Sequence, residues 1–212
     1  MRIAFLFLAI NSFACFAQST PKFTKKRVLS DLKFLRESLE ETHYNLYAYT
    51  SKNEFDSTYR ELSSSLAKDS LTLLEATNLY QNLISLANNS HTEIAFPGQS
   101  YFEYAQSGGT LFPLEVALEN EKALIRKNWS KNEDIEIGAE LLSINDVPIQ
   151  EVLDSLSGQL SAERTYFKNA KIEFYSLPRL YWQVFGEQES FKVEIKTDGI
   201  NKAFHINAIN LI

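Results

Sequence analysis

Apolar residues recur at steps of three and four over residues 25–88, which predicts three amphipathic helices. The second and third helices each begin at a pair with capping-box spacing, Ser51 with Glu54 and Thr72 with Glu75. The three apolar faces comprise Val28, Leu32, Leu35 and Leu39, then Phe55, Tyr59, Leu62 and Leu66, and finally Leu79, Leu83 and Leu86. Together these faces are sufficient for a small helical bundle.

The second half of the chain consists of short apolar runs separated by turn residues, which is typical of strands. Asn145-Asp146 and Asp198-Gly199 indicate two-residue hairpin turns, because Asn, Asp and Gly tolerate positive φ. Val152, Leu153 and Leu156 then follow at helical spacing. The predicted strands are Leu111–Leu118, Ala123–Arg126, Leu141–Ile144, Phe191–Ile195 and Ala203–Ile209.

Helices followed by strands predict an α+β fold class with two modules and a linker between them. Pro97-Gly98 and Gly108-Gly109 mark the linker. The last segment is apolar and has no polar closing element, so it either closes the sheet or begins a downstream domain. The predicted bounds are 1–17 for a signal peptide, 18–96 for a helical domain, 97–110 for the linker, 111–200 for a β module and 201–212 for this last segment.

The N-terminal residues have the pattern of a secretory signal, with Arg2 before the apolar run Ile3–Ile10 and cleavage expected after Ala17. An exported, periplasmic or extracellular protein is therefore predicted. Cys15 offers an alternative, a lipoprotein signal acylated on that cysteine, although Ser12 stands where an aliphatic residue is expected. Cys15 is the chain's one cysteine, so cleavage after Ala17 leaves a mature protein without disulfides.

The charge balance bounds the partners of the protein. The chain has 21 basic and 27 acidic residues, a net charge of −6. An acidic protein is a poor partner for nucleic acid or an anionic membrane surface, so neither is expected. Outside the N-terminal segment no apolar run approaches 18 residues, so no transmembrane span is predicted either. Composition does not indicate the oligomeric state.

Three motifs, taken in order, resemble the tail-specific (C-terminal processing) serine protease family, which includes the tricorn core. They are His43-Tyr44-Asn45-Leu46-Tyr47, Asn89-Ser90-His91-Thr92 and the segment Gly138–Ile149. The last of these is similar to the family's PDZ-like insert, in which a strand, a tight turn, a short strand and a helix follow one another. The resemblance therefore implies a three-helix bundle followed by a PDZ-like mixed β module.

A lone histidine at a helix end is more often structural than catalytic, but the resemblance gives His91 a candidate role. In the tricorn-like branch, a serine stands immediately before a histidine that acts as general base for a nucleophilic serine in a later domain. Carried over, His91 accepts the serine proton and Ser90 helps to orient the imidazole or to polarise the site. In the other branch, a Ser–Lys pair in the later domain does the chemistry, and His91 is structural.

No serine in the sequence stands as the matching nucleophile, because no Gly-x-Ser-x-Gly or similar elbow is present. The expected function is thus the N-terminal portion of an exported serine endopeptidase, truncated before its nucleophile and inactive alone. The alternative is a non-catalytic periplasmic peptide-binding or scaffold protein with a PDZ-like module.

Either function implies a peptide or protein partner, since a PDZ groove binds an extended peptide as an added strand. Leu111-Phe112-Pro113-Leu114 lies near the position of the carboxylate-binding loop, but Pro113 removes a backbone donor. No cofactor is expected. No metal is expected either, because His43, His91 and His205 are scattered and lack supporting carboxylates.

Overall fold

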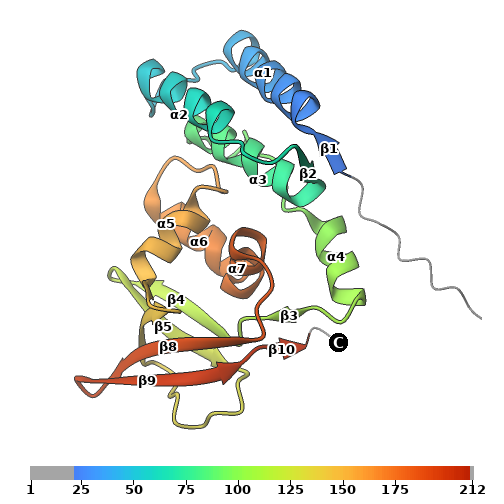
Figure 1. Cartoon of the computed structure of the whole chain (residues 1–212). Coiled ribbons are helices and arrows are strands. Elements are labelled where there is room, and N and C mark those ends of the chain that lie inside the picture. Colours follow the sequence, from blue (N-terminus) through green and yellow to red (C-terminus); the bar gives the residue numbers. More distant parts are fainter. Residues whose placement is uncertain (1–21, 211–212) are drawn as a thin grey trace, which may run out of the picture.

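The computed structural model describes residues 22–210 as a mixed α+β fold, which confirms the predicted fold class. The predicted signal peptide and Cys15 lie outside the described residues, so cleavage and acylation stay predictions. The first three helices form one layer, and an antiparallel sheet with its own helices forms most of the rest (Figure 1). The division into domains likewise stays a prediction.

The helical layer consists of the three predicted helices. Ser51 and Thr72 both accept a bond from the backbone N–H three residues on, and Thr72 completes its capping box with Glu75. A short antiparallel pairing of β1 with β2, which the sequence pattern did not predict, ties the start of the first helix to that of the third. The elements are β1 (Lys22–Thr24), α1 (Lys25–Thr42), α2 (Lys52–Ser64), β2 (Ser70–Thr72), α3 (Leu73–Ile84) and the 3₁₀ turn η1 (Ser85–Ala87).

The sheet has the strand order β4-β5-β6-β8-β9, entirely antiparallel, with the short strand β7 paired to β6. Its two predicted hairpin turns are present, since Asn145, Asp146, Asp198 and Gly199 all have positive φ. The strands are β3 (Thr110–Leu111), β4 (Leu114–Glu119), β5 (Lys122–Asn128), β6 (Glu140–Ile144), β7 (Val147–Pro148), β8 (Ser190–Thr197), β9 (Ile200–Asn207) and β10 (Ile209–Asn210).

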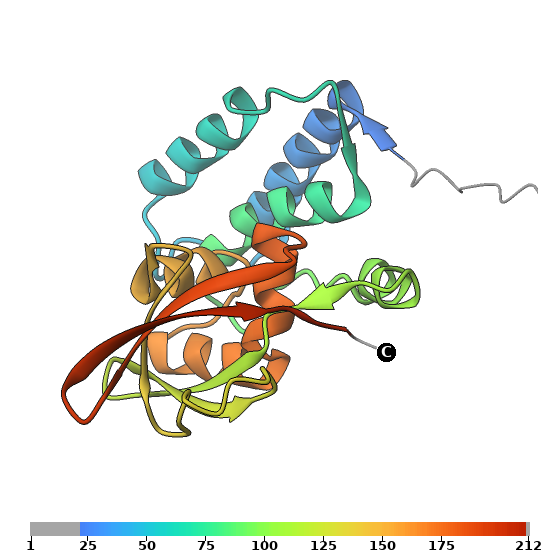
Figure 2. The same ribbon diagram turned by 60° about the horizontal axis from the view of Figure 1, so that its bottom comes forward.

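Three helices lie between the sheet and the helical layer, where Figure 2 shows them against one face of the sheet. They are α5 (Ile149–Ser157), α6 (Thr165–Tyr175) and α7 (Leu177–Phe185). Their buried side chains meet the inward residues of β8, of which Phe191, Val193 and Ile195 alternate as predicted. β9 stands last in the strand order and is therefore an edge strand. Its Ile206 is buried in the same core.

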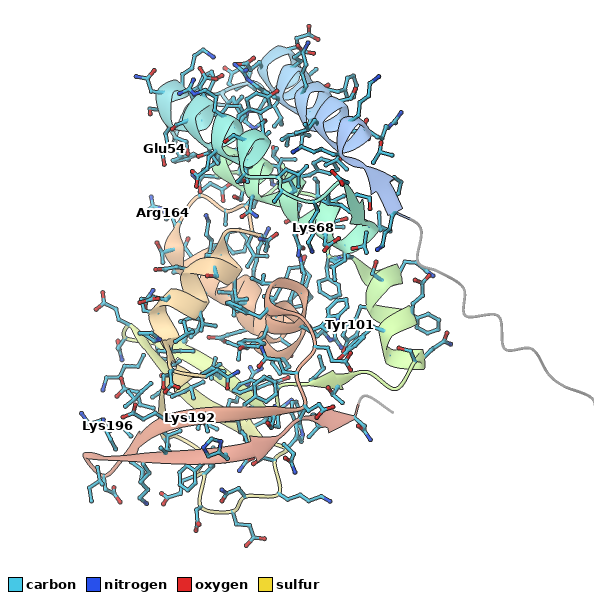
Figure 3. The ribbon with its side chains drawn as sticks, in the orientation of Figure 1. Glu54, Lys68, Tyr101, Arg164, Lys192 and Lys196 are labelled. Atoms are coloured by element: carbon cyan, nitrogen blue, oxygen red, sulfur yellow. The ribbon has the colours of Figure 1, made fainter. Side chains whose placement is uncertain are left out.

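The structure differs from the expected elements at two places between residues 97 and 119. Residues 97–110, the predicted linker, contain the helix α4 (Gly98–Gln106), whose Tyr104 stacks on Trp182 of α7 with ring centroids 5.0 Å apart. Tyr101 of α4, labelled in Figure 3, also packs edge-on against Trp182. The expected strand Leu111–Leu118 is interrupted at Phe112-Pro113, because proline cannot donate to a ladder.

The helical layer and the sheet part are joined through a buried amide network between α3 and α7. Gln183 Nε2 donates to Gln81 Oε1 at 2.6 Å and to Asn78 Oδ1 at 2.9 Å, and Asn78 Nδ2 donates to the Gln183 carbonyl at 2.7 Å. Gln81 and Gln183 are 2% and 3% exposed. Buried amides of this kind are costly to leave unpaired, so the network fixes how the two parts meet.

Candidate functional site

The predicted site loop begins where the third helix ends. The 3₁₀ turn η1 stops at Asn88, which has φ 43°, a left-handed conformation that asparagine tolerates better than most residues. Its side-chain Nδ2 donates to the hydroxyl of buried Thr50 at 2.8 Å. This reversal ends the helix and directs the Asn89-Ser90-His91 segment toward the sheet part.

His91 presents its imidazole to solvent at this junction. Its backbone N–H donates to Asn89 Oδ1 at 2.9 Å, an Asx-type turn that fixes the main chain on the N-terminal side of the ring. Across residues 22–210 no group is hydrogen-bonded to the His91 ring itself. The ring is therefore open to a group that approaches from outside.

Ser90 is bound by Glu163, which lies in the segment between α5 and α6. Both the backbone N–H and the hydroxyl of Ser90 donate to Glu163 Oε1, each at 3.1 Å. The hydrogen bond from the Ser90 N–H is the main reason why the pKa of the Glu163 carboxyl lies below its ordinary value. The charge of nearby His91 lowers it further.

This geometry decides what Ser90 can do chemically. A serine nucleophile needs a base whose pKa lies near the working pH. Glu163, to which the Ser90 hydroxyl donates, has a lowered pKa and is therefore a weak base. Ser90 is consequently held as a structural donor, an arrangement that agrees with an orienting role and not with a nucleophilic one.

A second set of bonds joins the same two segments. The Ser161 hydroxyl accepts from the Asn89 N–H at 3.0 Å and donates to the Asn89 carbonyl at 2.9 Å. Ser161 is only 1% exposed. Lys171 of α6 donates to the Ser161 carbonyl at 2.9 Å and forms an ion pair with Glu93. Sheet-part residues thus hold the loop along its whole length from Asn89 to Glu93.

The helical layer holds the loop from the other side. Gln81 Nε2 donates to the carbonyls of Ile94 and Ala95 at 2.9 and 3.2 Å. His43 Nε2 lies 3.1 Å from the Thr92 hydroxyl, so the first family-like motif contacts the second. His43 therefore serves the packing of this loop.

Sequence reasoning located Ser90 and His91 but missed Ser161 and Glu163. These partners lie 72 and 73 residues further along the chain, and no spacing rule links the two segments. Figure 3 labels Arg164, the residue after Glu163, where the segment before α6 comes up toward the helical layer.

The edge of the predicted peptide-binding module is partly occupied by the protein's own side chains. β4 is an edge strand of the sheet, and an edge strand is where an added peptide strand would pair. The Leu118 N–H of this strand donates to Glu173 Oε1 of α6 at 2.7 Å. A cavity of about 470 Å³ lies beside it, with Leu118, Lys122 and Leu153 in its lining.

Three further features of residues 22–210 bear on the site. His, Cys, Asp and Glu side chains do not gather there in groups of three that would suit a metal ion. The helices of the same stretch include none that is both long and apolar enough to cross a bilayer. A larger cavity of about 770 Å³ lies between the loop at Trp129 and the strand residues around His205, and no site-loop residue lines it.

Comparison with known proteins gives a fold relationship. No protein-family model matches the sequence, and no curated protein matches it. The structure of mature CPAF complexed with lactacystin aligns with a TM-score of 0.59 at 14% identity, covering 87% of this chain and 35% of that one. A serine-to-alanine mutant of CPAF and mature CPAF itself both align with a TM-score of 0.57, at 15% and 16% identity.

CPAF is a chlamydial serine protease of the tail-specific-protease-like kind. The present chain spans about a third of the length of these CPAF structures. Identities of this size show a common fold and no more. The chain therefore shares the fold of a part of CPAF.

Proposed function

We propose that this chain is the N-terminal part of an exported serine endopeptidase of the tail-specific family, with His91 as the general base. The observation that carries the proposal is the Asn89–Glu93 loop, which is bound by Glu163 on one side and by His43 on the other while the His91 ring stays exposed. The fold likeness to CPAF supports it at a coarser level, that of a serine protease.

In the proposed mechanism His91 takes the proton of a serine hydroxyl as that oxygen attacks a peptide carbonyl, and returns it to the leaving amine. Within residues 22–210 no serine is hydrogen-bonded to the His91 ring, so we place the nucleophilic serine outside this stretch. The substrate is a peptide or protein chain. Ser90 and Glu163 hold the backbone beside the base and take no proton themselves.

The test uses the gene together with whatever coding sequence follows Ile212. We expect the extended protein to cleave casein and to react at one serine with a fluorophosphonate probe. His91→Ala lowers both rates by about 10²–10⁴-fold, the usual contribution of a general base. The 212-residue chain alone remains unlabelled, because it has no activated serine.

His205→Ala is the matched control, since His205 is also exposed but lies on β9 away from the loop. Full activity in the His91→Ala protein, with an essential lysine in the later domain, would contradict the role of His91 and favour the Ser–Lys branch. A coding region that closes at Ile212, or an extended protein that never reacts, would leave the alternative of a non-catalytic peptide-binding protein.

A further inference from the structure

The contact between the site loop and the Ser161–Glu163 segment is made of directional bonds between two stretches distant in sequence. Four hydrogen bonds join Asn89 and Ser90 to Ser161 and Glu163, with lengths of 2.9–3.1 Å. Two involve a backbone donor and one a backbone acceptor of the loop. The contact therefore restrains the main chain beside His91 as well as its side chains.

Glu163 has no other evident task within the described structure. Across residues 22–210 its carboxylate enters no ion pair, and its side-chain hydrogen bonds to other residues both come from Ser90. It also precedes α6, whose N-cap residue Arg164 makes no side-chain capping bond. With these partners, the carboxylate restrains Ser90 and contributes little to the stability of the hydrophobic core.

We propose that Glu163 is a positioning residue for His91, acting through Ser90. By accepting from both the N–H and the hydroxyl of Ser90, it fixes the Asn89–Ser90 peptide unit and the side chain of the residue that precedes the histidine. Hydrogen bonds to an ionised carboxylate are stronger than neutral ones, so both bonds favour the charged form of Glu163. The catalytic part of this inference rests on the proposed function, whereas the positioning itself does not.

The first experiment measures amide hydrogen exchange at Ser90 and His91 by NMR in the 212-residue protein. Glu163→Ala removes both bonds, and we expect exchange at the Ser90 amide to accelerate about 10- to 100-fold, as for loss of hydrogen bonds to a charged group. Glu163→Gln keeps an acceptor oxygen at the same place, so it restores most of the protection. Amides in α1 and β8 keep their rates, which shows that the fold is intact.

Glu133→Gln is the matched control, because Glu133 is an exposed loop glutamate outside this contact. His91→Ala leaves protection at Ser90 unchanged, since the imidazole has no part in the bonds. If Glu163→Ala and wild type exchange the Ser90 amide at equal rates, the positioning role is overturned, whatever the enzyme assays give.

The second experiment uses the extended protein in which His91 is tested as the base. Glu163→Ala lowers kcat by about 10-fold with KM nearly unchanged, because a displaced base loses transition-state contacts and not substrate binding. Glu163→Gln recovers most of this loss. Equal kcat values for wild type and Glu163→Ala would overturn the catalytic part, while inactivity that does not depend on His91 would count against the proposed function instead.

Discussion

The protonation state of Glu163 controls the contact beside His91. Its carboxylate accepts from the N–H and hydroxyl of Ser90, and these bonds are strongest while the group is ionised. The Ser90 N–H lowers the pKa of Glu163 below the ordinary value of 4.5, with the hydroxyl and the charge of His91 acting in the same direction. Arg164, Lys171 and Glu93 are further charged side chains of this region, the last two paired with each other.

A lowered carboxyl pKa means that the contact gains stability above the unfolded pKa and loses it as the pH falls through the folded pKa. We predict that the Glu163 carboxyl carbon titrates with a midpoint below 4.5, and that the Ser90 amide signal of the His91→Ala protein follows the same transition. An NMR titration of the Glu163 carboxyl carbon and the Ser90 amide checks this. A midpoint at or above 4.5 would contradict the assignment, and Glu163→Gln abolishes the transition.

At the residue scale, the sequence was informative about Ser90 and His91 because they are adjacent and lie just beyond a recognisable helix. The sequence did not predict the partners of these two residues. Ser161 and Glu163 come together with the loop only because α5 and α6 are folded against the sheet, and neither residue stands in a motif. A tertiary contact between two loops leaves no periodicity in the chain.

The Asn145-Asp146 turn is the element-scale feature that fixes the pairing of β6 with its neighbours. Both residues have positive φ, 51° and 65°, as a two-residue hairpin requires. Asn145 also binds the next strand, because its Oδ1 accepts from the Lys192 N–H at 2.8 Å and its own N–H donates to the Lys192 carbonyl at 2.7 Å. Asp146 forms only an exposed ion pair with Lys192.

Asn145→Ala should therefore lower the free energy of unfolding by about 1–3 kcal/mol, through backbone strain and a buried donor left unpaired. Asp146→Gly should change it by less than about 1 kcal/mol, because glycine adopts this φ freely and an exposed ion pair contributes little. Urea unfolding followed by circular dichroism measures both. Equal effects of the two substitutions would show that the bonds of Asn145 to Lys192 carry no weight.

The elements that the sequence predicted are those whose burial is one-sided. α1, α2 and α3 each bury one stripe, and β8 buries every second residue, so their periods are visible. α7 buries six of its nine residues, Pro178 and Gln183 among them, and its two polar positions are too few to mark a helix in so short a segment. α6 buries only Ile172 and exposes Tyr166 and Phe174, so its apolar residues follow no face.

At the scale of the whole molecule, the amide network of Gln81, Asn78 and Gln183 joins the helical layer to the sheet part. Gln81 uses its oxygen for Gln183 and its nitrogen for the carbonyls of Ile94 and Ala95. One buried side chain thus contacts α7 and the far end of the site loop together. None of this was visible in the sequence, where glutamines are taken for surface residues.

Gln183→Leu removes the donor to the buried Gln81 Oε1 and to the partly buried Asn78 Oδ1. We predict a loss of about 2–4 kcal/mol in the free energy of unfolding, since each unpaired buried group costs about 1–3 kcal/mol and relaxation recovers a part. Urea unfolding gives the value. Gln150→Leu on the exposed side of α5 is the control, and it should stay within about 0.5 kcal/mol of wild type. A similar effect of both changes would argue against the network.

The loop that carries His91 is tied to both parts of the molecule, to Gln81 on one side and to Glu163 on the other. Because the loop is anchored to both parts, its position changes when the distance between them changes. A ligand or substitution that shifts the sheet part relative to the helices therefore moves the histidine without contacting it. The position of His91 thus depends on how the two parts meet. The His91 ring signals of the Gln183→Leu protein would show this at a distance, and unchanged signals would mean that one anchor alone sets its position.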